Sequence, residues 1–213
     1  MIGLPDNECA LAGKRLLIFD FDGTIADTSP LHAAAFEKVL APLGIRVDYR
    51  EIAGMKTADA VNLCLKSSRV QLEPDGEAML VQDKQQLVRN LIEKQLCAFP
   101  GVDEFLCWAR GRYQLAMVTS GSRGTVHLAL AKLGYRGWFN PFVCADDLQK
   151  GKPDPEGYLK VLQSVGVPAD QALVFEDSKA GFEAAVAAGL SYIDVSSLNW
   201  FDLKKRGENT YGY

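Results

Sequence analysis

The sequence lacks the features of a disulfide-stabilised, secreted or membrane-spanning chain. Its five cysteines are odd in number and include no Cys-x-x-Cys pair, which favours reduced thiols over disulfides or a zinc site. They are Cys9, Cys64, Cys97, Cys107 and Cys144. No apolar run approaches the length that crosses a bilayer, and the first residues, with Pro5, Asp6 and Glu8, lack the apolar core of a signal peptide. We therefore expect a cytoplasmic protein.

The sequence also lacks a strong excess of charge of either sign. The 213 residues contain 23 Lys and Arg against 27 Asp and Glu, and the net charge of −4 gives no attraction for nucleic acid or an anionic membrane. The short basic run at residues 204–206 is interpreted as the solvated end of a helix. We expect no nucleic-acid partner and no membrane partner, and a monomer or weak dimer.

The second half of the chain shows a regular alternation of short apolar runs and segments of helical period. The expected strands are 115–118, 142–144, 173–175 and 192–195. Between them, apolar residues recur at i, i+3, i+4 and i+7, which is the pattern of helices that bury one face. This alternation predicts an α/β fold, with a parallel sheet covered by helices on both faces.

A pair of aspartates follows the first apolar run, Leu16–Phe19. The run predicts a strand buried on both faces, and Gly23 allows a sharp turn, so Asp20 and Asp22 are expected at the carboxyl edge of the sheet, where α/β proteins bind ligands. Bringing two carboxylates together costs free energy unless a cation, a proton or both lie between them. The pair alone is also compatible with a solvated turn.

About seventy residues between the first strand and the regular half contain no convincing strand. A helix opened by Pro30 and closed by Gly44 is expected, followed by a long helix through Leu80, Leu87 and Leu91. We interpret 27–98 as an inserted helical cap and 1–26 with 99–213 as the catalytic core. Because the insertion leaves and re-enters at the carboxyl edge, it is placed to act as a lid. The alternative is a structural hairpin that packs on the side of the sheet.

The later strand ends carry groups that bind phosphate and metal. Hydroxyls and amides at Thr119 and Ser120 begin a helix and suit an oxyanion. Lys152 lies in a proline-stiffened loop, and Glu176 and Asp177 form a second acidic pair. Each has a structural explanation as a helix cap, a surface lysine or a surface ion pair. Together with the first pair they predict an all-oxygen site for Mg²⁺ and the parts needed for phosphoryl transfer.

Four segments resemble the motifs of the haloacid dehalogenase superfamily, in the order that the family has them. They are Asp20–Thr24, Thr119–Ser122, Gly151–Pro155 and Phe175–Gly181. Within that superfamily the chain resembles the branch of sugar-phosphate phosphatases and β-phosphoglucomutase. The resemblance covers nearly the whole chain and implies a Rossmann-like core with a small helical cap inserted after the first motif.

The resemblance also implies roles for the two aspartates of the first motif. Asp20 would be the nucleophile, and its charge would lie beside Mg²⁺. Asp22 would protonate the leaving oxygen and then activate water, and its backbone carbonyl would bind the metal.

The other motif residues would bind the phosphoryl group and the metal. Thr119, Ser120 and Lys152 would bind the phosphoryl oxygens of the substrate. Asp177 and Glu176 would complete the Mg²⁺ site directly or through water.

Two cap residues are further candidates for substrate binding. His32 is in the first turn of the cap, where related enzymes often have a histidine near the general acid, although a lone histidine is as often structural. Chains like β-phosphoglucomutase have a lysine and an arginine at the places of Ala53 and Thr57, which weakens the mutase interpretation. Lys56 is left as a source of displaced positive charge.

The sequence therefore predicts a Mg²⁺-dependent phosphatase of small phosphorylated metabolites, sugar phosphates in particular, that acts through an aspartyl-phosphate. The first alternative is a phosphosugar mutase like β-phosphoglucomutase. The second, from another class, is a non-catalytic phosphometabolite-binding protein.

Overall fold

The computed structural model describes residues 10–210, and within them five parallel strands form one sheet in the order β3-β2-β1-β4-β5. The strands are β1 (Leu16–Phe19), β2 (Gln114–Val118), β3 (Phe142–Val143), β4 (Ala172–Glu176) and β5 (Ser191–Asp194). The central strand β1 is buried at every residue, as expected of a strand with helices on both sides. The predicted α/β fold with a parallel sheet is confirmed.

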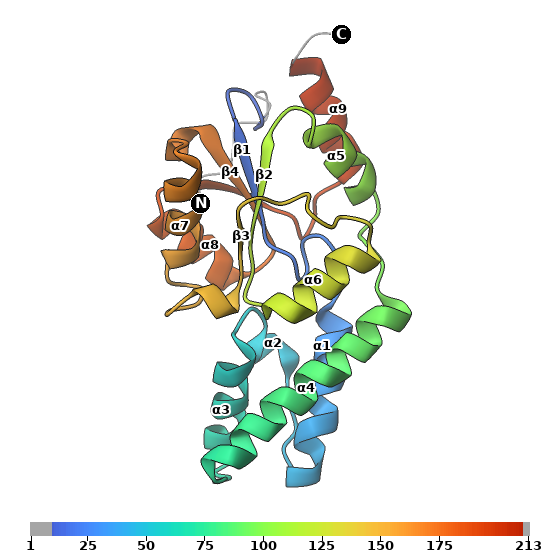
Figure 1. Ribbon diagram of the computed structural model, residues 1–213, viewed down its shortest axis with the longest axis vertical. Coiled ribbons are helices and arrows are strands. Elements are labelled where there is room, and N and C mark those ends of the chain that lie inside the picture. The colour runs from blue at the N-terminus through green and yellow to red at the C-terminus, as the bar shows by residue number, and fades with distance from the viewer. Residues whose placement is uncertain (1–9, 211–213) are drawn as a thin grey trace.

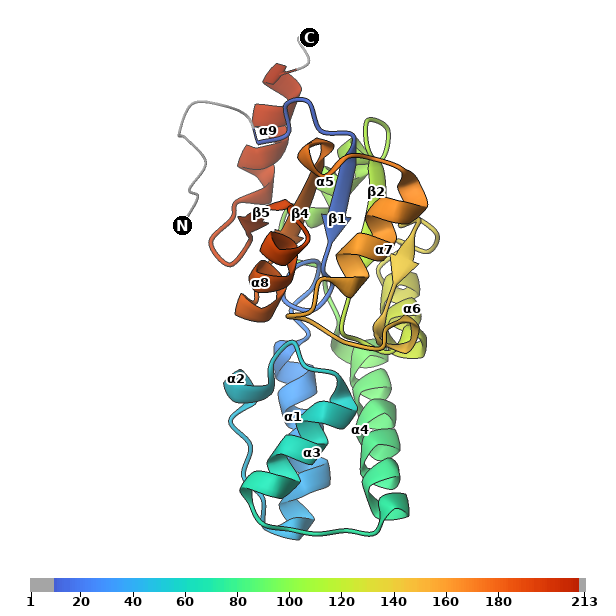
Figure 2. The same cartoon turned by 90° about the vertical axis from the view of Figure 1, so that its left-hand side faces the viewer.

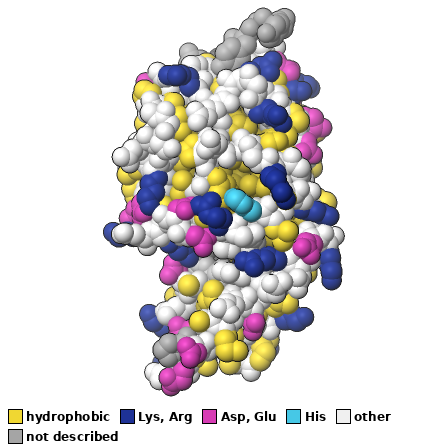
Figure 3. Space-filling model, viewed as in Figure 1, with side chains coloured by type: hydrophobic (Ala, Val, Ile, Leu, Met, Phe, Trp, Pro, Cys, Tyr) yellow, Lys and Arg dark blue, Asp and Glu magenta, His cyan; other side chains and the backbone are white. Residues whose placement is uncertain are grey.

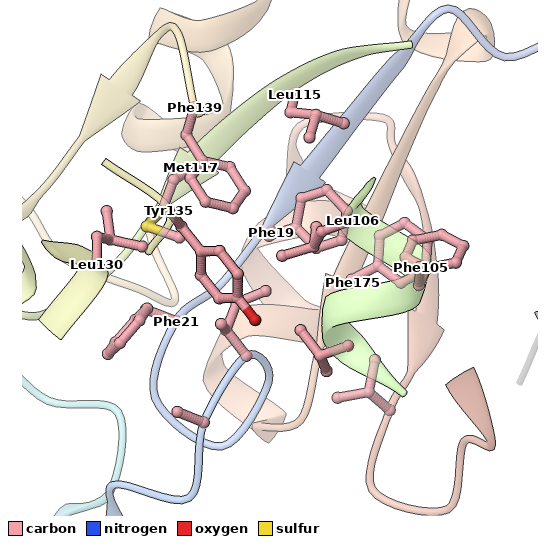
Figure 4. Close-up of a cluster of buried hydrophobic side chains, with 14 of the residues drawn as sticks. Phe19, Phe21, Phe105, Leu106, Leu115, Met117, Leu130, Tyr135, Phe139 and Phe175 are labelled. Carbon is pink, nitrogen blue, oxygen red and sulfur yellow. The ribbon is translucent and has the colours of Figure 1, made fainter. Parts of the chain in front are cut away.

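Helices cover both faces of the sheet (Figure 1). The core helices are α5 (Val102–Ala109), α6 (Arg123–Lys132), α7 (Glu156–Val165), α8 (Lys179–Ala187) and α9 (Trp200–Thr210). On the face of α5, α6 and α9, Phe19 stacks on Phe175 with ring centroids 4.7 Å apart, and Phe105 packs against both (Figure 4). On the face of α7 and α8, Leu16 and Ile18 pack instead. The alternation of side chains along β1 thus divides the core into two apolar layers.

The chain between β1 and α5 forms a helical unit at the carboxyl ends of the strands, rather than beside the sheet (Figure 2). Its helices are α1 (Ser29–Leu40), α2 (Tyr49–Ile52), α3 (Thr57–Ser67) and α4 (Pro74–Gln95). They share an apolar core of their own, which includes Phe36, Leu40, Ile52 and Val61. Pro30 lies in the first turn of α1, as expected, and Gly44 ends the following short 3-10 turn with φ of 72°. The helices α2 and α3 were not predicted individually.

Cys9 and the outer ends of the predicted core, 1–9 and 211–213, lie outside the described residues. The other four cysteines are free thiols.

No helix between residues 10 and 210 is both long and apolar enough to span a bilayer. On the face seen in Figure 3, Lys and Arg side chains are spread among Asp and Glu rather than gathered in one patch.

Candidate active site

Strand register brings the acidic motifs together. Phe19 pairs with Phe175 in neighbouring parallel strands, and the Asp20 amide donates a hydrogen bond of 3.0 Å to the Phe175 carbonyl. Asp20, which follows β1, therefore lies beside Glu176, the last residue of β4. Carboxylate oxygens of Asp20, Glu176 and Asp177 are all within 4.8 Å of one another.

Lys152 reaches this cluster from the loop before α7. Its Nζ lies 2.6 Å from Asp20 Oδ1 and 3.3 Å from Glu176 Oε2, and its side chain is only 4% exposed. The aromatic ring of Tyr158, from α7, lies 5.6 Å from the ammonium. Burial alone would lower the pKa of Lys152, but the charges of Asp20 and Glu176 raise it well above its usual value. Lys152 is therefore a fixed cation.

Positive charge remains in deficit at this edge. Three carboxylates face one ammonium, which leaves an excess of two negative charges when all are ionised. Burial and the charge of Glu176 raise the pKa of Asp20 well above its usual value, and the same two causes raise the pKa of Asp177 to about 7. A divalent cation between the carboxylates would remove this deficit.

The hydrogen bonds indicate which oxygens are open to a cation. Glu176 accepts from Ser178 on one oxygen and from Lys152 on the other. Asp20 accepts from Lys152 through Oδ1, and Asp177 accepts from Thr24 through Oδ1 at 3.2 Å. Among the described residues, the Oδ2 atoms of Asp20 and Asp177 accept no hydrogen bond from a neighbour. Two open carboxylate oxygens in an all-oxygen cluster fit Mg²⁺.

Two motif glycines are required by this packing. Gly23 has φ of +83°, and a Cβ there would lie 2.1 Å from Asp177 Oδ2. A Cβ at Gly181, in α8, would lie 1.7 Å from Glu176 Oε1. Any larger residue at either position would displace a carboxylate of the cluster.

Asp22 lies on the cap side of the pocket in a different environment. Its Oδ1 accepts a hydrogen bond of 2.6 Å from Thr28 and lies 3.5 Å from His32 Nε2. Burial alone would raise the pKa of Asp22, but the charge of His32 and the Thr28 hydrogen bond outweigh it and lower the pKa to about 2. The two aspartates of the first motif thus have pKa values shifted in opposite directions, as is common where two carboxyl groups have different roles.

Lys84, from α4, is a site residue that the sequence analysis missed. Its Nζ lies 2.8 Å from His32 Nδ1 and 4.3 Å from the centroid of the Phe36 ring, and the residue is only 2% exposed. Burial lowers the pKa of Lys84 to about 8. The available signal was a lysine four residues after Leu80 and four before Val88, on the apolar stripe of the long helix.

The predicted phosphate cradle is only partly exposed to the pocket. Ser120 lines the pocket together with Gly121 and Ser122. Thr119 is buried behind them, and its hydroxyl accepts a hydrogen bond of 3.0 Å from the Gly121 amide. The Thr119 hydroxyl retains its own proton for donation.

The cap closes the other side of the pocket and leaves little free volume. The cavity measures about 60 Å³, which is room for on the order of four water molecules. His32 lines this cavity. Lys56 does not: its Nζ donates a hydrogen bond of 2.7 Å to the Leu148 carbonyl of the core, outside the cavity. A guest larger than a phosphoryl group requires the cap to shift outward.

Comparison with known proteins identifies the family. The sequence profile described as haloacid dehalogenase-like hydrolase matches residues 17–195. The chain is 34% identical over 185 residues to fructose-1-phosphate phosphatase YqaB of Escherichia coli, covering 85% of this chain and 96% of that protein. It is 32% identical over 189 residues to the phosphorylated carbohydrates phosphatase of Thermotoga maritima, covering 86% of each.

A solved structure gives the same result for the fold. CbbY from Rhodobacter sphaeroides in complex with phosphate superimposes with a TM-score of 0.76 at 27% identity, over 84% of each chain. The resemblance inferred from the four motifs is therefore confirmed, and the chain belongs to the family of haloacid dehalogenase-like hydrolases.

Proposed function

We propose that this protein is a Mg²⁺-dependent phosphatase that hydrolyses small phosphorylated metabolites, sugar phosphates in particular, through an aspartyl-phosphate on Asp20. The observation that carries the proposal is the Asp20 carboxylate, held by Lys152 beside two further carboxylates at the floor of a pocket of phosphoryl size. The names of the two curated relatives, both phosphatases of phosphorylated sugars, support the same class of substrate.

Asp20 and Asp177 would hold the Mg²⁺ ion through their open oxygens. The family pattern adds the backbone carbonyl of Asp22, while Glu176, with both oxygens engaged, would act through water or through its charge. When bound, the ion would offset the negative charge of the nucleophile and of the phosphoryl oxygens.

The first half-reaction is a phosphoryl transfer to the enzyme. An Asp20 oxygen forms a bond to phosphorus while the ester P–O bond breaks, and Asp22 gives a proton to the departing alcohol oxygen. Lys152 and the hydroxyls and amides at Thr119 and Ser120 bind the phosphoryl oxygens. In the second half-reaction water attacks phosphorus, Asp22 takes its proton, and the Asp20–phosphorus bond breaks to release inorganic phosphate.

The environment of Asp22 suits the second half-reaction directly. A pKa of about 2 keeps it ionised in the free protein, which is the form that activates water. Donating a proton in the first half-reaction requires a higher pKa. Entry of an anionic phosphoryl group beside Asp22 supplies that shift, because a nearby negative charge disfavours the carboxylate.

A hydrolase is favoured over the mutase alternative by the cap. A mutase must hold a second phosphate opposite Lys152, which calls for fixed positive charge. Ala53 is apolar, and the Thr57 hydroxyl accepts a hydrogen bond from Lys84 at 3.4 Å. We expect phosphorus NMR to show inorganic phosphate from β-glucose 1-phosphate, with little glucose 6-phosphate even when a bisphosphate primer is present. Faster formation of glucose 6-phosphate than of phosphate would establish the mutase.

The test of the proposed function is phosphate release from sugar phosphates and p-nitrophenyl phosphate, measured with Mg²⁺ and with EDTA. Activity should require Mg²⁺, and Asp20→Asn should reduce it by several orders of magnitude. Asp83→Asn, at an exposed position of α4, is the matched control and should leave activity unchanged. Retention of more than about a tenth of the activity by Asp20→Asn would exclude Asp20 as the nucleophile. Absence of release from every ester would favour the binding-protein alternative.

A further inference from the structure

The wall of the pocket contributed by the cap differs in charge from the wall contributed by the core. The core wall carries the carboxylate cluster and Lys152. The polar groups of the cap wall are His32, Tyr49, Thr57, Lys84 and Gln85, with Ser29 beside them. Once the cap has shifted outward to admit it, the leaving group of a phosphate ester bound at Asp20 would face this cap wall.

Neither lysine that lines the pocket is free to hold a second anion. Lys152 is engaged by Asp20 and Glu176. Lys84 directs its ammonium at His32 Nδ1, at the Thr57 hydroxyl 3.4 Å away, and at the face of the Phe36 ring. These three contacts engage the Lys84 ammonium.

The groups that remain available on the cap wall are neutral. The Gln85 amide has no hydrogen-bond partner within the part of the chain that the structure describes, although it lines the pocket. The Tyr49 hydroxyl lies near that of Ser29 and can still take a further hydrogen bond, since a phenol both donates and accepts. Burial and the charges of Asp22, Asp177 and Asp20 raise the pKa of Tyr49, so the hydroxyl stays protonated.

We infer that the pocket selects phosphate esters of uncharged, hydroxyl-bearing alcohols, and that Tyr49 and Gln85 are specificity-determining residues that bind the hydroxyls of the leaving group. This inference rests on the proposed phosphatase function. A carboxylate or second phosphate on the leaving group would lose water against a wall whose two basic side chains are already engaged, Lys84 by His32 and Thr57 and His32 by Asp22, and close to the carboxylates of the core. A hydroxyl in the same place exchanges its water for the amide of Gln85 or the phenol of Tyr49.

Matched substrate pairs test the selectivity of the wild-type enzyme. Glycerol 3-phosphate and 3-phosphoglycerate differ in a hydroxymethyl group against a carboxylate, and fructose 1-phosphate and fructose 1,6-bisphosphate differ in a second phosphate. In each pair we expect kcat/KM for phosphate release to be at least about tenfold higher for the neutral leaving group. Equal values, or a preference for the anionic partner of either pair, would overturn the inference while leaving the phosphatase function intact.

Variants test the two named residues. Tyr49→Phe and Gln85→Leu should each lower kcat/KM for fructose 1-phosphate by about three- to tenfold, as expected for one lost hydrogen bond, mainly through KM. With p-nitrophenyl phosphate, which has no hydroxyl on its leaving group, the same variants should change kcat/KM by less than about twofold. Gln86→Leu, at the exposed neighbouring position, is the control.

The pattern across substrates separates specificity from stability. Equal losses on fructose 1-phosphate and p-nitrophenyl phosphate would assign Tyr49 or Gln85 a structural role and overturn its part of the inference. Absence of phosphate release by the wild-type enzyme from every ester, p-nitrophenyl phosphate included, would instead refute the proposed function.

Discussion

Replacing Asp177 with asparagine should stabilise the metal-free protein at neutral pH. Burial and the charge of Glu176 raise the pKa of Asp177 from 3.8 to about 7, so the folded state binds its proton more tightly than the unfolded state. Between these two pH values, ionisation of Asp177 therefore makes the wild type less stable as the pH rises. Asparagine cannot ionise, and its carbonyl oxygen can still accept the Thr24 hydrogen bond.

The size of the effect follows from the shift of about three pKa units. At about 1.4 kcal/mol per unit, the variant should gain up to about 4 kcal/mol in free energy of unfolding at pH 7.5, and under about 1 kcal/mol at pH 4. Urea unfolding in EDTA at both pH values measures the gain. With Mg²⁺ the difference should shrink or reverse, because the ion stabilises the wild type and the variant lacks a charged ligand.

The control for this prediction is Asp83→Asn, which removes one negative charge at an exposed position of α4. It should shift stability by less than about 0.5 kcal/mol at either pH. If Asp177→Asn were no more stable than the wild type in EDTA at pH 7.5, or if Mg²⁺ stabilised both equally, Asp177 would not be part of a strained cation site.

Three further substitutions test other parts of the site. Asp22→Ala should slow both half-reactions by about 10²- to 10⁴-fold with sugar phosphates. With p-nitrophenyl phosphate, whose leaving group needs no proton, rapid-quench kinetics should show that formation of the phosphoenzyme is rescued more than its breakdown. Equal rescue of both steps would contradict the role of Asp22 as acid and base in both half-reactions. Lys84→Met should lower kcat, because Lys84 holds His32 beside Asp22; it should not lower the thermal midpoint, because methionine fills the space and no buried charge remains at position 84. An unchanged kcat would show that Lys84 is only structural. Lys56→Met removes the hydrogen bond from the cap to the Leu148 carbonyl, so the amides at 148–152 should exchange hydrogen faster. The exposed control Lys66→Met should leave their exchange unchanged. Equal protection of these amides in both variants would show that the Lys56–Leu148 hydrogen bond does not hold the cap against the core.

The acidic residues that the sequence predicted lie at the ends of strands or directly after them. Asp20 and Glu176 come next to each other because β1 and β4 are parallel neighbours in register, and an apolar run followed by an acid is visible in one dimension. Lys152 was found through its motif and its prolines rather than through a strand. The buried ion pair with Asp20 then follows from the fold.

The parts that the sequence did not predict lie in the cap. The apolar face of α3 is short, because its buried residues are only Ala60, Val61 and Leu65, and the helix was not predicted. Lys84 and Tyr49 reach the pocket only because the helices of the cap pack against one another and over the core. Lys56 was expected near the substrate because of its position in the cap loop. Its side chain instead points to the Leu148 carbonyl of the core, and the position of that carbonyl cannot be read from spacing along the chain.

The core wall and the cap wall of the pocket differ in how strongly their residues are constrained, and therefore in which substitutions they tolerate. The core wall is constrained by buried charges: a Cβ at Gly23 or Gly181 would strike a carboxylate, and loss of Lys152 would leave Asp20 and Glu176 buried without a counterion. On the cap wall, by contrast, Tyr49 and Gln85 are partly exposed, and neither takes part in an ion pair among the described residues. Substitutions there change which leaving group is accepted at a cost of about one hydrogen bond each. Substrate preference should therefore change through the cap while the phosphoryl-transfer chemistry stays the same.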